Sequence, residues 1–414
     1  MLVIAGCGGD GDPPAEADAD ADDPTEAAAE ASSTTSTTTT TTTTTAPPTT
    51  SVAPGPTAEQ VRERIETGLM TASGTTSLTD RMAEQAVPGL AVAVVIDGEP
   101  LTAFAVGTTP SGTAMTESTL IQVGSVSKPV AALTVLSVAA EGGVDLDADI
   151  ETLLTSYALP AGEQTAANPV TLARLLAHDA GTNVDGFLGY ASAAESPARP
   201  DLLAGGGNTD AVTVVQAPGS GFLYSGGGYE LMAQTLADAT GSDWDTLVAD
   251  AIFGPAGMAD SFYALDLTAE QAARATEGSV NGEMLGNGWQ AHPEGAAAGL
   301  WTTAEDLASL VAAFSRSLAG TDDTLLPTEW AQRAVRPTVP TAPSGAAAQG
   351  FFVDDVEDPT RWSHGGRNIG YTAEIAGAID GSYAVVVVTN GFPGGSDLAR
   401  EIIATVEAEL EVAR

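Results

Sequence analysis

Basic residues and cysteine are scarce in this 414-residue chain. Fourteen lysines and arginines stand against 55 aspartates and glutamates, which gives a formal net charge of −41. Such a chain has no basic surface with which to neutralise phosphates, so nucleic acid is excluded as a partner. The same acidity excludes electrostatic binding to an anionic membrane. The single cysteine, Cys7, excludes an intrachain disulfide.

Long apolar runs are missing as well. No segment reaches the roughly 18 consecutive apolar residues that a membrane-spanning helix needs. The hydrophobic fraction of 43% is nevertheless sufficient for a full core. The length allows one large domain or two of ordinary size.

The first part of the chain does not have the composition of a folded domain. Residues 4–7, IAGC, resemble a bacterial lipobox, in which the cysteine is lipidated. Residues 1–7 are therefore interpreted as the remnant of a lipoprotein signal, with Cys7 as the lipidation site. Residues 8–55 are acidic and then rich in threonine, cannot bury apolar surface, and are predicted to form a disordered linker. The expected location is extracellular, anchored to the cell membrane, with membrane contact only through the lipid on Cys7.

Two hairpins are predicted at opposite ends of the remaining domain, residues 56–414. Residues 89–107 form two apolar runs around an Asp-Gly turn, and residues 371–390 repeat that pattern. Because the hairpins lie near the two ends of the domain, one antiparallel sheet built from both termini is expected.

Helices are predicted before, between and after these hairpins. Amphipathic patterns predict a helix near residues 59–70 and a final helix from about 396 to 413, and residues 125–290 are mainly helical with long loops. Thr302 and Glu305 are spaced as a capping box at the start of a further helix. The predicted fold class is therefore α+β (mixed α/β), with a sheet flanked by N- and C-terminal helices and a mainly helical region inserted.

The only lysine of the chain, Lys128, lies three residues after Ser125 in the sequence GSVSKP. Side chains three positions apart lie on the same face of a helix. Pro129 belongs in the first turn of a helix, so Ser125 is predicted at the helix N-terminus, where negative charge is favoured. A serine hydroxyl needs a base, and a lysine buried by the apolar run that follows can serve as one. Ser127 points to another face.

The sequence around this pair resembles the serine β-lactamase-like, penicillin-binding family, which includes class C β-lactamases, D-alanyl-D-alanine carboxypeptidases, D-aminopeptidases and esterases. IQVGSVSKPVAAL followed by EGGVDLD is similar to the opening block of that family. The resemblance spans about residues 57–412, and it implies the fold predicted above and no cofactor or metal. Further blocks follow in family order: LLAHDAG, FLYSGGGYELMAQTLADATG, FGPAGM, AGLWTTAEDLASL and WSHGGRNIGYTAEI.

The resemblance assigns catalytic roles to three of these residues. Ser125 would be the nucleophile and Lys128 its partner. Tyr224 would be a second base, which holds the proton of Ser125 and passes it to the leaving group. The implied reaction is acyl transfer through an ester on Ser125, followed by hydrolysis.

The resemblance also assigns substrate-binding roles to the HGGR segment. His364 and Gly366 would line the pocket on an edge strand. The backbone N–H groups of Ser125 and Arg367 would form an oxyanion hole, in which one donor contributes about 3–4 kcal/mol in other hydrolases.

Gly226 departs from the family pattern, which has an asparagine at the end of Tyr-x-Asn. That asparagine binds the amide group of the substrate, so amide and β-lactam substrates lose a contact here. The sequence therefore favours an esterase-like, exported serine hydrolase that acts on a small ester or peptide. Two alternatives remain open. One is a D-amino-acid peptidase, carboxypeptidase or β-lactamase, and the other is a non-catalytic binding lipoprotein, which Gly226 and the bulky Arg367 would suit.

The other histidines and several aromatic residues have simpler interpretations. His178 is expected to pack the loop after its helix, and His292 is expected in an exposed loop. The three histidines of the chain have no ligand spacing, so no metal site is predicted. Three aromatic residues are expected in the core or at the rim of a pocket: Trp301, Phe351 and Tyr371.

Overall fold

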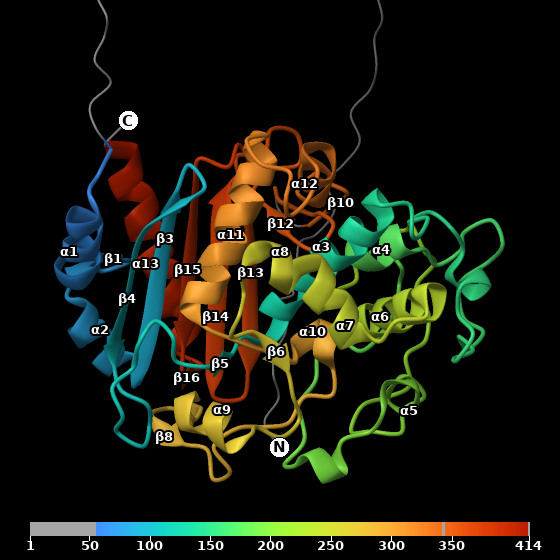
Figure 1. Cartoon of the computed structure of the whole chain (residues 1–414), viewed down its shortest axis with the longest axis horizontal. Helices are drawn as coiled ribbons and strands as arrows, with labels where there is room; N and C mark the ends of the chain where they lie inside the picture. The colour runs from blue at the N-terminus through green and yellow to red at the C-terminus, as the bar shows by residue number, and fades with distance from the viewer. Residues whose placement is uncertain (1–54, 342–343, 413–414) are drawn as a thin grey trace, which may run out of the picture. The chain divides into compact units, whose positions relative to one another are not determined.

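The computed structural model describes residues 55–341 and 344–412. The signal remnant, Cys7 and almost all of the linker lie outside these residues, so their assignments stay predictions. In the described part of the chain, no helix has both the length and the apolar character needed to cross a bilayer. Helices cover both faces of a large sheet (Figure 1).

The large sheet joins the two ends of the domain. Its eight antiparallel strands, counted among the described residues, have the order β10-β11-β12-β13-β14-β15-β3-β4, so the N-terminal hairpin pairs with the C-terminal one through β3 and β15. Both predicted hairpins are confirmed. The strands are β3 (Gly89–Ile96), β4 (Glu99–Gly107), β10 (Val339–Pro340), β11 (Ala346–Ala347), β12 (Phe352–Val353), β13 (Arg361–Asn368), β14 (Tyr371–Ala378) and β15 (Tyr383–Thr389).

Successive side chains of β3 enter two separate cores, because neighbouring residues of a strand point to opposite faces. Leu90, Val92 and Val94 pack with the terminal helices, whereas the alternate residues pack with the inner helices. The uninterrupted apolar run of β3 therefore belongs to a strand that is covered on both faces. The terminal helices are α1 (Ala58–Gly68), α2 (Leu78–Glu84) and α13 (Gly395–Val412), and the inner helices include α3 (Ser127–Ala140), α11 (Ala304–Ala319) and α12 (Thr328–Ala334).

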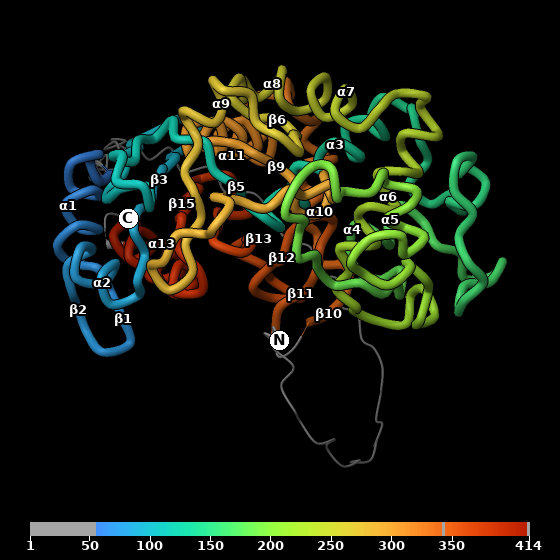
Figure 2. Tube along the Cα trace, turned by 90° about the horizontal axis from the view of Figure 1, so that it is seen from below, coloured from blue at the N-terminus to red at the C-terminus, as the bar shows by residue number. Residues whose placement is uncertain are grey.

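The region between β4 and β10 is mainly helical, as predicted, and α4 to α7 lie on the side away from α1 and α2 (Figure 2). Besides α3, α11 and α12, it contains α4 (Leu172–Leu176), α5 (Arg199–Leu203), α6 (Gly226–Thr240), α7 (Trp244–Val248), α8 (Gly254–Ala256), α9 (Ala269–Arg274) and α10 (Gly295–Ala298). The small sheets comprise β1 (Leu69–Thr71) with β2 (Gly74–Thr76), β5 (Ile121–Gln122) with β9 (Leu300–Thr302) and β6 (Phe262–Tyr263), and β16 (Gly391–Phe392) with β7 (Ser279–Val280) and β8 (Glu283–Met284).

The start of α11 differs from the prediction by one residue. Thr303, not Thr302, caps the helix, and its hydroxyl accepts a hydrogen bond from the Asp306 N–H at 3.0 Å. The predicted capping box of Thr302 with Glu305 is therefore wrong. Thr302 is the last residue of β9, and its hydroxyl lies 2.7 Å from that of Ser261, so it is not free to cap.

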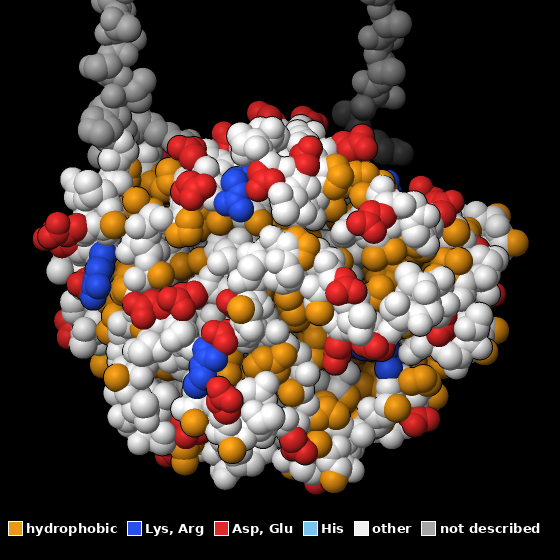
Figure 3. All heavy atoms as spheres, viewed as in Figure 1, with side chains coloured by type: hydrophobic (Ala, Val, Ile, Leu, Met, Phe, Trp, Pro, Cys, Tyr) orange, Lys and Arg blue, Asp and Glu red, His pale blue; other side chains and the backbone are white. Residues whose placement is uncertain are grey.

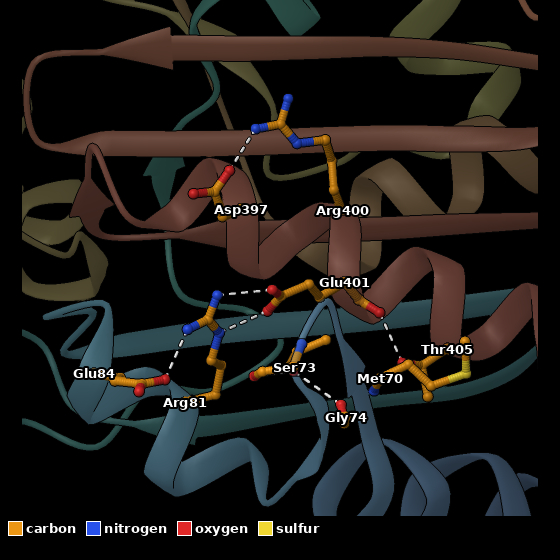
Figure 4. Close-up of polar contacts among 10 residues, drawn as sticks. Met70, Ser73, Gly74, Arg81, Glu84, Asp397, Arg400, Glu401 and Thr405 are labelled. Atoms are coloured by element: carbon orange, nitrogen blue, oxygen red, sulfur yellow. Dashed lines mark hydrogen bonds and ion pairs between the residues drawn. The ribbon is translucent and has the colours of Figure 1, made fainter.

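Acidic side chains are spread over the visible face of the molecule, with few basic ones among them (Figure 3). One arginine joins two of the terminal helices. Arg81 of α2 donates two hydrogen bonds to the Glu401 carboxylate of α13, at 2.8 and 2.7 Å, and a third to Glu84 (Figure 4). These bonds raise the pKa of Arg81 above its ordinary value. The fork of two parallel bonds fixes α2 against α13.

Glu401→Gln is expected to lower the free energy of unfolding by about 1–2 kcal/mol, because one charged hydrogen bond and the ion pair are lost at a site where both side chains are mostly buried. Urea denaturation followed by circular dichroism measures the loss. The matched control is Glu66→Gln, which breaks the exposed Arg62–Glu66 pair and is expected to cost less than about 0.5 kcal/mol. Equal losses in the two variants would show that the Arg81 contact contributes nothing special.

Candidate active site

Ser125 and Lys128 are in contact at the start of α3. Ser125 lies in a 3₁₀ turn, Gly124–Val126, and the α-helix begins two residues after it at Ser127. Lys128 Nζ donates a hydrogen bond to Ser125 Oγ at 3.0 Å. The lysine side chain is buried, whereas Ser125 is half-buried. The predicted pairing therefore holds, with Ser125 in the preceding turn instead of within the helix.

Ser127 has a different task. It is fully buried, its hydroxyl donates to the Gly124 carbonyl at 2.7 Å, and it accepts from the Leu300 N–H at 3.1 Å. These bonds fasten the turn to β9. Both partners of the hydroxyl are backbone groups, so Ser127 supports the turn that presents Ser125.

Neutral groups hold the amine of Lys128. Besides Ser125, Nζ bonds the Ala297 carbonyl at 2.9 Å, and it lies 5.0 and 5.6 Å from the ring centroids of Tyr224 and Tyr229. Among the described residues no carboxylate forms an ion pair with Lys128. The face of an aromatic ring attracts a cation, but unlike a carboxylate it carries no opposite charge. The amine is thus directed at Ser125 and is not neutralised by an acid.

Tyr224 lies next to this pair. It is the residue before Ser225, the N-cap of α6, so the start of that helix positions its ring. Its half-buried ring packs on the imidazole of His178, with centroids 4.3 Å apart. The ring of Phe352 lies on it as well, at 6.4 Å. The structure therefore brings together the three side chains that the sequence selected for catalysis.

His178 supports Tyr224, a contact that the sequence did not indicate. Its backbone is left-handed, with φ of 58°, and its Nδ1 accepts a hydrogen bond from the Ser225 N–H at 3.1 Å. Burial lowers the pKa of His178 well below its ordinary value, and the charge of Lys128 adds to that effect. The imidazole is therefore neutral at pH 7, accepts through Nδ1 and carries its proton on Nε2.

The strand β13 lies directly against the turn that carries Ser125. A Cβ at Gly366 would collide with the Val123 carbonyl and come 2.9 Å from the Ser125 nitrogen. Gly124 has φ of 51°, and a Cβ there would come 2.6 Å from the Arg367 nitrogen. The two backbone N–H groups predicted to form an oxyanion hole thus lie on segments in direct contact. The hole itself stays a prediction, since it requires both donors within hydrogen-bond distance of one substrate oxygen.

His364 and Arg367 point to opposite faces of β13, because they are an odd number of residues apart. His364 is buried next to Phe352, and burial together with the charge of Lys128 lowers its pKa to about 3, so it is neutral at pH 7. The prediction of an edge strand is wrong, because β13 lies between β12 and β14 in the sheet. His364 follows the two residues of β13 that pair with β12, and it pairs with Ile375 of β14. The Arg367 side chain is exposed on the face of Glu374, so its bulk lies on the opposite face of β13 from His364.

The glycines at the start of α6 allow a loop, residues 182–187, to lie on the helix. The N–H of Gly226 donates to the Asp185 carbonyl at 3.1 Å, and that of Gly227 donates to the Val184 carbonyl at 2.9 Å. A Cβ at Gly226 would come 2.9 Å from the ring of Phe187. A side chain at this position would therefore meet both the ring of Phe187 and the carbonyl of Asp185.

The prediction that His292 is exposed is wrong. Its side chain is buried, with Nδ1 3.4 Å from a carboxylate oxygen of Glu294. The segment enters the core because the small residues of α10 that follow it pack on α3. No group of three histidine, cysteine, aspartate or glutamate side chains that could hold a metal occurs within the described residues. The core placement of the three aromatic residues is confirmed: Trp301, Phe351 and Tyr371 are buried.

Comparisons with known proteins agree with this architecture. A curated relative, penicillin-binding protein 4 of Amycolatopsis lactamdurans, is 32% identical over 181 residues, which span 43% of this chain and only 45% of that protein. The octameric penicillin-binding protein homologue from Pyrococcus abyssi superposes with a TM-score of 0.65 at 21% identity, over 80% of this chain and 76% of that one. The penicillin-binding protein from Bacillus halodurans gives 0.62 at 19% identity, over 80% of this chain and 98% of that one.

These two solved structures share the fold of this chain. The family itself is identified by a match to a sequence-family model. The family model described as Beta-lactamase matches residues 75–409, from the short β2 strand to the last turns of α13. That range contains every residue of the site described above. Because the match covers most of the sequence, the chain belongs to the serine β-lactamase and penicillin-binding family.

Proposed function

We propose that this protein is a serine hydrolase that forms an ester on Ser125 and then hydrolyses it. The observation that supports this most strongly is the 3.0 Å contact between Nζ of the buried Lys128 and Oγ of the half-buried Ser125. A base and a nucleophile within hydrogen-bond distance are the minimum that acyl transfer to serine requires. Membership of the family supports the same class of reaction.

The proposed reaction has two halves. The substrate carbonyl oxygen binds to the N–H groups of Ser125 and Arg367, and Ser125 Oγ attacks the carbonyl carbon as its proton moves to the neutral form of the Lys128 amine. Tyr224 gives a proton to the leaving group, whose bond to the acyl carbon breaks. Water then attacks the acyl carbon and loses a proton to the deprotonated Tyr224. Lys128 returns its proton to Ser125 Oγ as the bond between that oxygen and the acyl carbon breaks, which releases the acid and the free serine.

An ester is the proposed substrate, because Gly226 has no amide side chain and Phe187 would crowd any side chain placed there. An ester has no N–H group that needs such a partner, whereas a peptide or β-lactam leaves its amide group unpaired. The competing proposal is a D-amino-acid peptidase or β-lactamase. We further propose that the protein is exported and anchored through Cys7, which the IAGC sequence supports.

A substrate panel tests the ester proposal. We expect kcat/KM for p-nitrophenyl acetate and butyrate to exceed that for nitrocefin and for a D-alanyl-D-alanine peptide by about a hundredfold, the scale on which an unpaired polar group discriminates. Ser125→Ala is the control for uncatalysed ester hydrolysis. Faster turnover of nitrocefin or of the peptide would overturn the ester preference. Absence of turnover of every substrate would favour the binding lipoprotein instead.

Lys128→Arg is expected to lower kcat/KM on the best ester by about 10³, because arginine stays protonated and cannot exchange a proton at neutral pH. Lys128→Met removes the charge at similar length and is expected to be equally inactive. Circular dichroism and the melting temperature serve as folding controls. A folded variant of either kind that keeps more than about a tenth of the activity would exclude Lys128 as the base.

Restoring the family amide tests the role assigned to Gly226. Because the ring of Phe187 leaves no room for a side chain at residue 226, we expect Gly226→Asn to affect acylation only in a Phe187→Ala background. In that background Gly226→Asn is expected to raise acylation by nitrocefin relative to the ester about tenfold. The single Phe187→Ala variant is the matched control. An unchanged ratio in a folded double variant would show that the amide contact does not decide the preference.

A further inference from the structure

Glu230 is a buried acid one turn into α6, and it contacts the same residue that holds Lys128. Its side chain has no exposed surface, and its Oε1 accepts a hydrogen bond from the Ala297 N–H at 2.9 Å. The carbonyl of Ala297 in turn accepts from Lys128 Nζ, also at 2.9 Å. One residue of α10 therefore connects the carboxylate to the amine.

The second oxygen of Glu230 is fixed from the opposite side. Arg199 of α5 donates from Nε to Oε2 at 2.8 Å, and its guanidinium lies 5.8 Å from the centroid of the Trp244 ring. Burial raises the pKa of Glu230, while the charge and hydrogen bond of Arg199 oppose that rise. Both carboxylate oxygens thus have directed partners, and the side chain has a single orientation.

α10 cannot hold the Ala297 carbonyl in place by itself. A helix of four residues is too short to be stable alone, and the sequence GAAA has no side chain longer than a methyl group. Its N-terminal N–H groups must find acceptors outside the helix, since helix ends leave such groups unpaired. Glu230 supplies that acceptor at Ala297. The direction of the carbonyl that meets Lys128 therefore depends on the carboxylate.

We infer that Glu230 is a positioning residue for Lys128. By binding the Ala297 N–H it fixes the position of the Ala297 carbonyl, which accepts a hydrogen bond from Lys128 Nζ. This contact keeps Nζ within hydrogen-bond distance of Ser125 Oγ. This role rests on the proposed function, because a position for the amine matters only if Ser125 is acylated. Glu230 itself touches neither Ser125 nor Lys128 among the contacts of these residues.

Two double variants isolate the hydrogen bond from the ion pair. Arg199→Met/Glu230→Gln removes both charges but keeps an acceptor for Ala297, whereas Arg199→Met/Glu230→Met removes the acceptor as well at similar side-chain length. A fluorophosphonate probe reports the rate at which Ser125 is labelled, and its final stoichiometry counts the folded sites. kcat and KM on the best ester are measured in parallel.

We expect the glutamine variant to label and turn over within about threefold of wild type. The methionine variant is expected to lose about 10- to 100-fold in both the labelling rate and kcat, with KM within about threefold and full stoichiometry, because a misplaced base slows proton transfer and not binding. Equal labelling rates in the two double variants would overturn the positioning role. So would a methionine variant with a lower labelling stoichiometry and melting temperature but an unchanged labelling rate. A wild-type protein that does not label would instead overturn the proposed function.

Discussion

The turn that carries Ser125 and the strand β13 approach so closely that neither Gly124 nor Gly366 has room for a side chain. This contact depends on the large sheet, because β13 is held in register by β14 along its whole length. It also depends on α3, whose buried first turn holds Ser125 at that depth. The site therefore lies where two parts of the domain meet. One part is the sheet made from both ends of the domain, and the other is the helical region inserted between them.

A second constraint is the charge balance around the only lysine. Lys128 is buried beside Ser125, two tyrosine rings and a carbonyl, and the nearby imidazoles of His178 and His364 have lowered pKa values. A second cation close to the protonated form of the Lys128 amine would be costly, so burial and repulsion lower the pKa of both histidines. Both histidines are therefore neutral at pH 7, and their rings pack on those of Tyr224 and Phe352.

The sequence predicted those parts of the fold that local patterns determine. Both hairpins were predicted because apolar runs meet at Asp-Gly turns, and the Ser125–Lys128 contact followed from helical spacing. Contacts between distant segments were not predictable in this way. Glu230 and Ala297 are 67 positions apart, and the loop over Gly226 comes from residues about forty positions earlier. His292 was misplaced for the same reason, since nothing local shows that the alanines after it pack on α3.

The central claim is that an acyl group is transferred to Ser125. The most direct test is to mix the protein with a p-nitrophenyl ester, quench with acid within the first turnovers, and map the added mass by peptide mass spectrometry. The mechanism predicts one acyl group on Ser125 and none on Ser127 or Tyr224, with no adduct and no turnover in Ser125→Ala. An acyl group on another side chain, or full turnover by the Ser125→Ala variant, would contradict it.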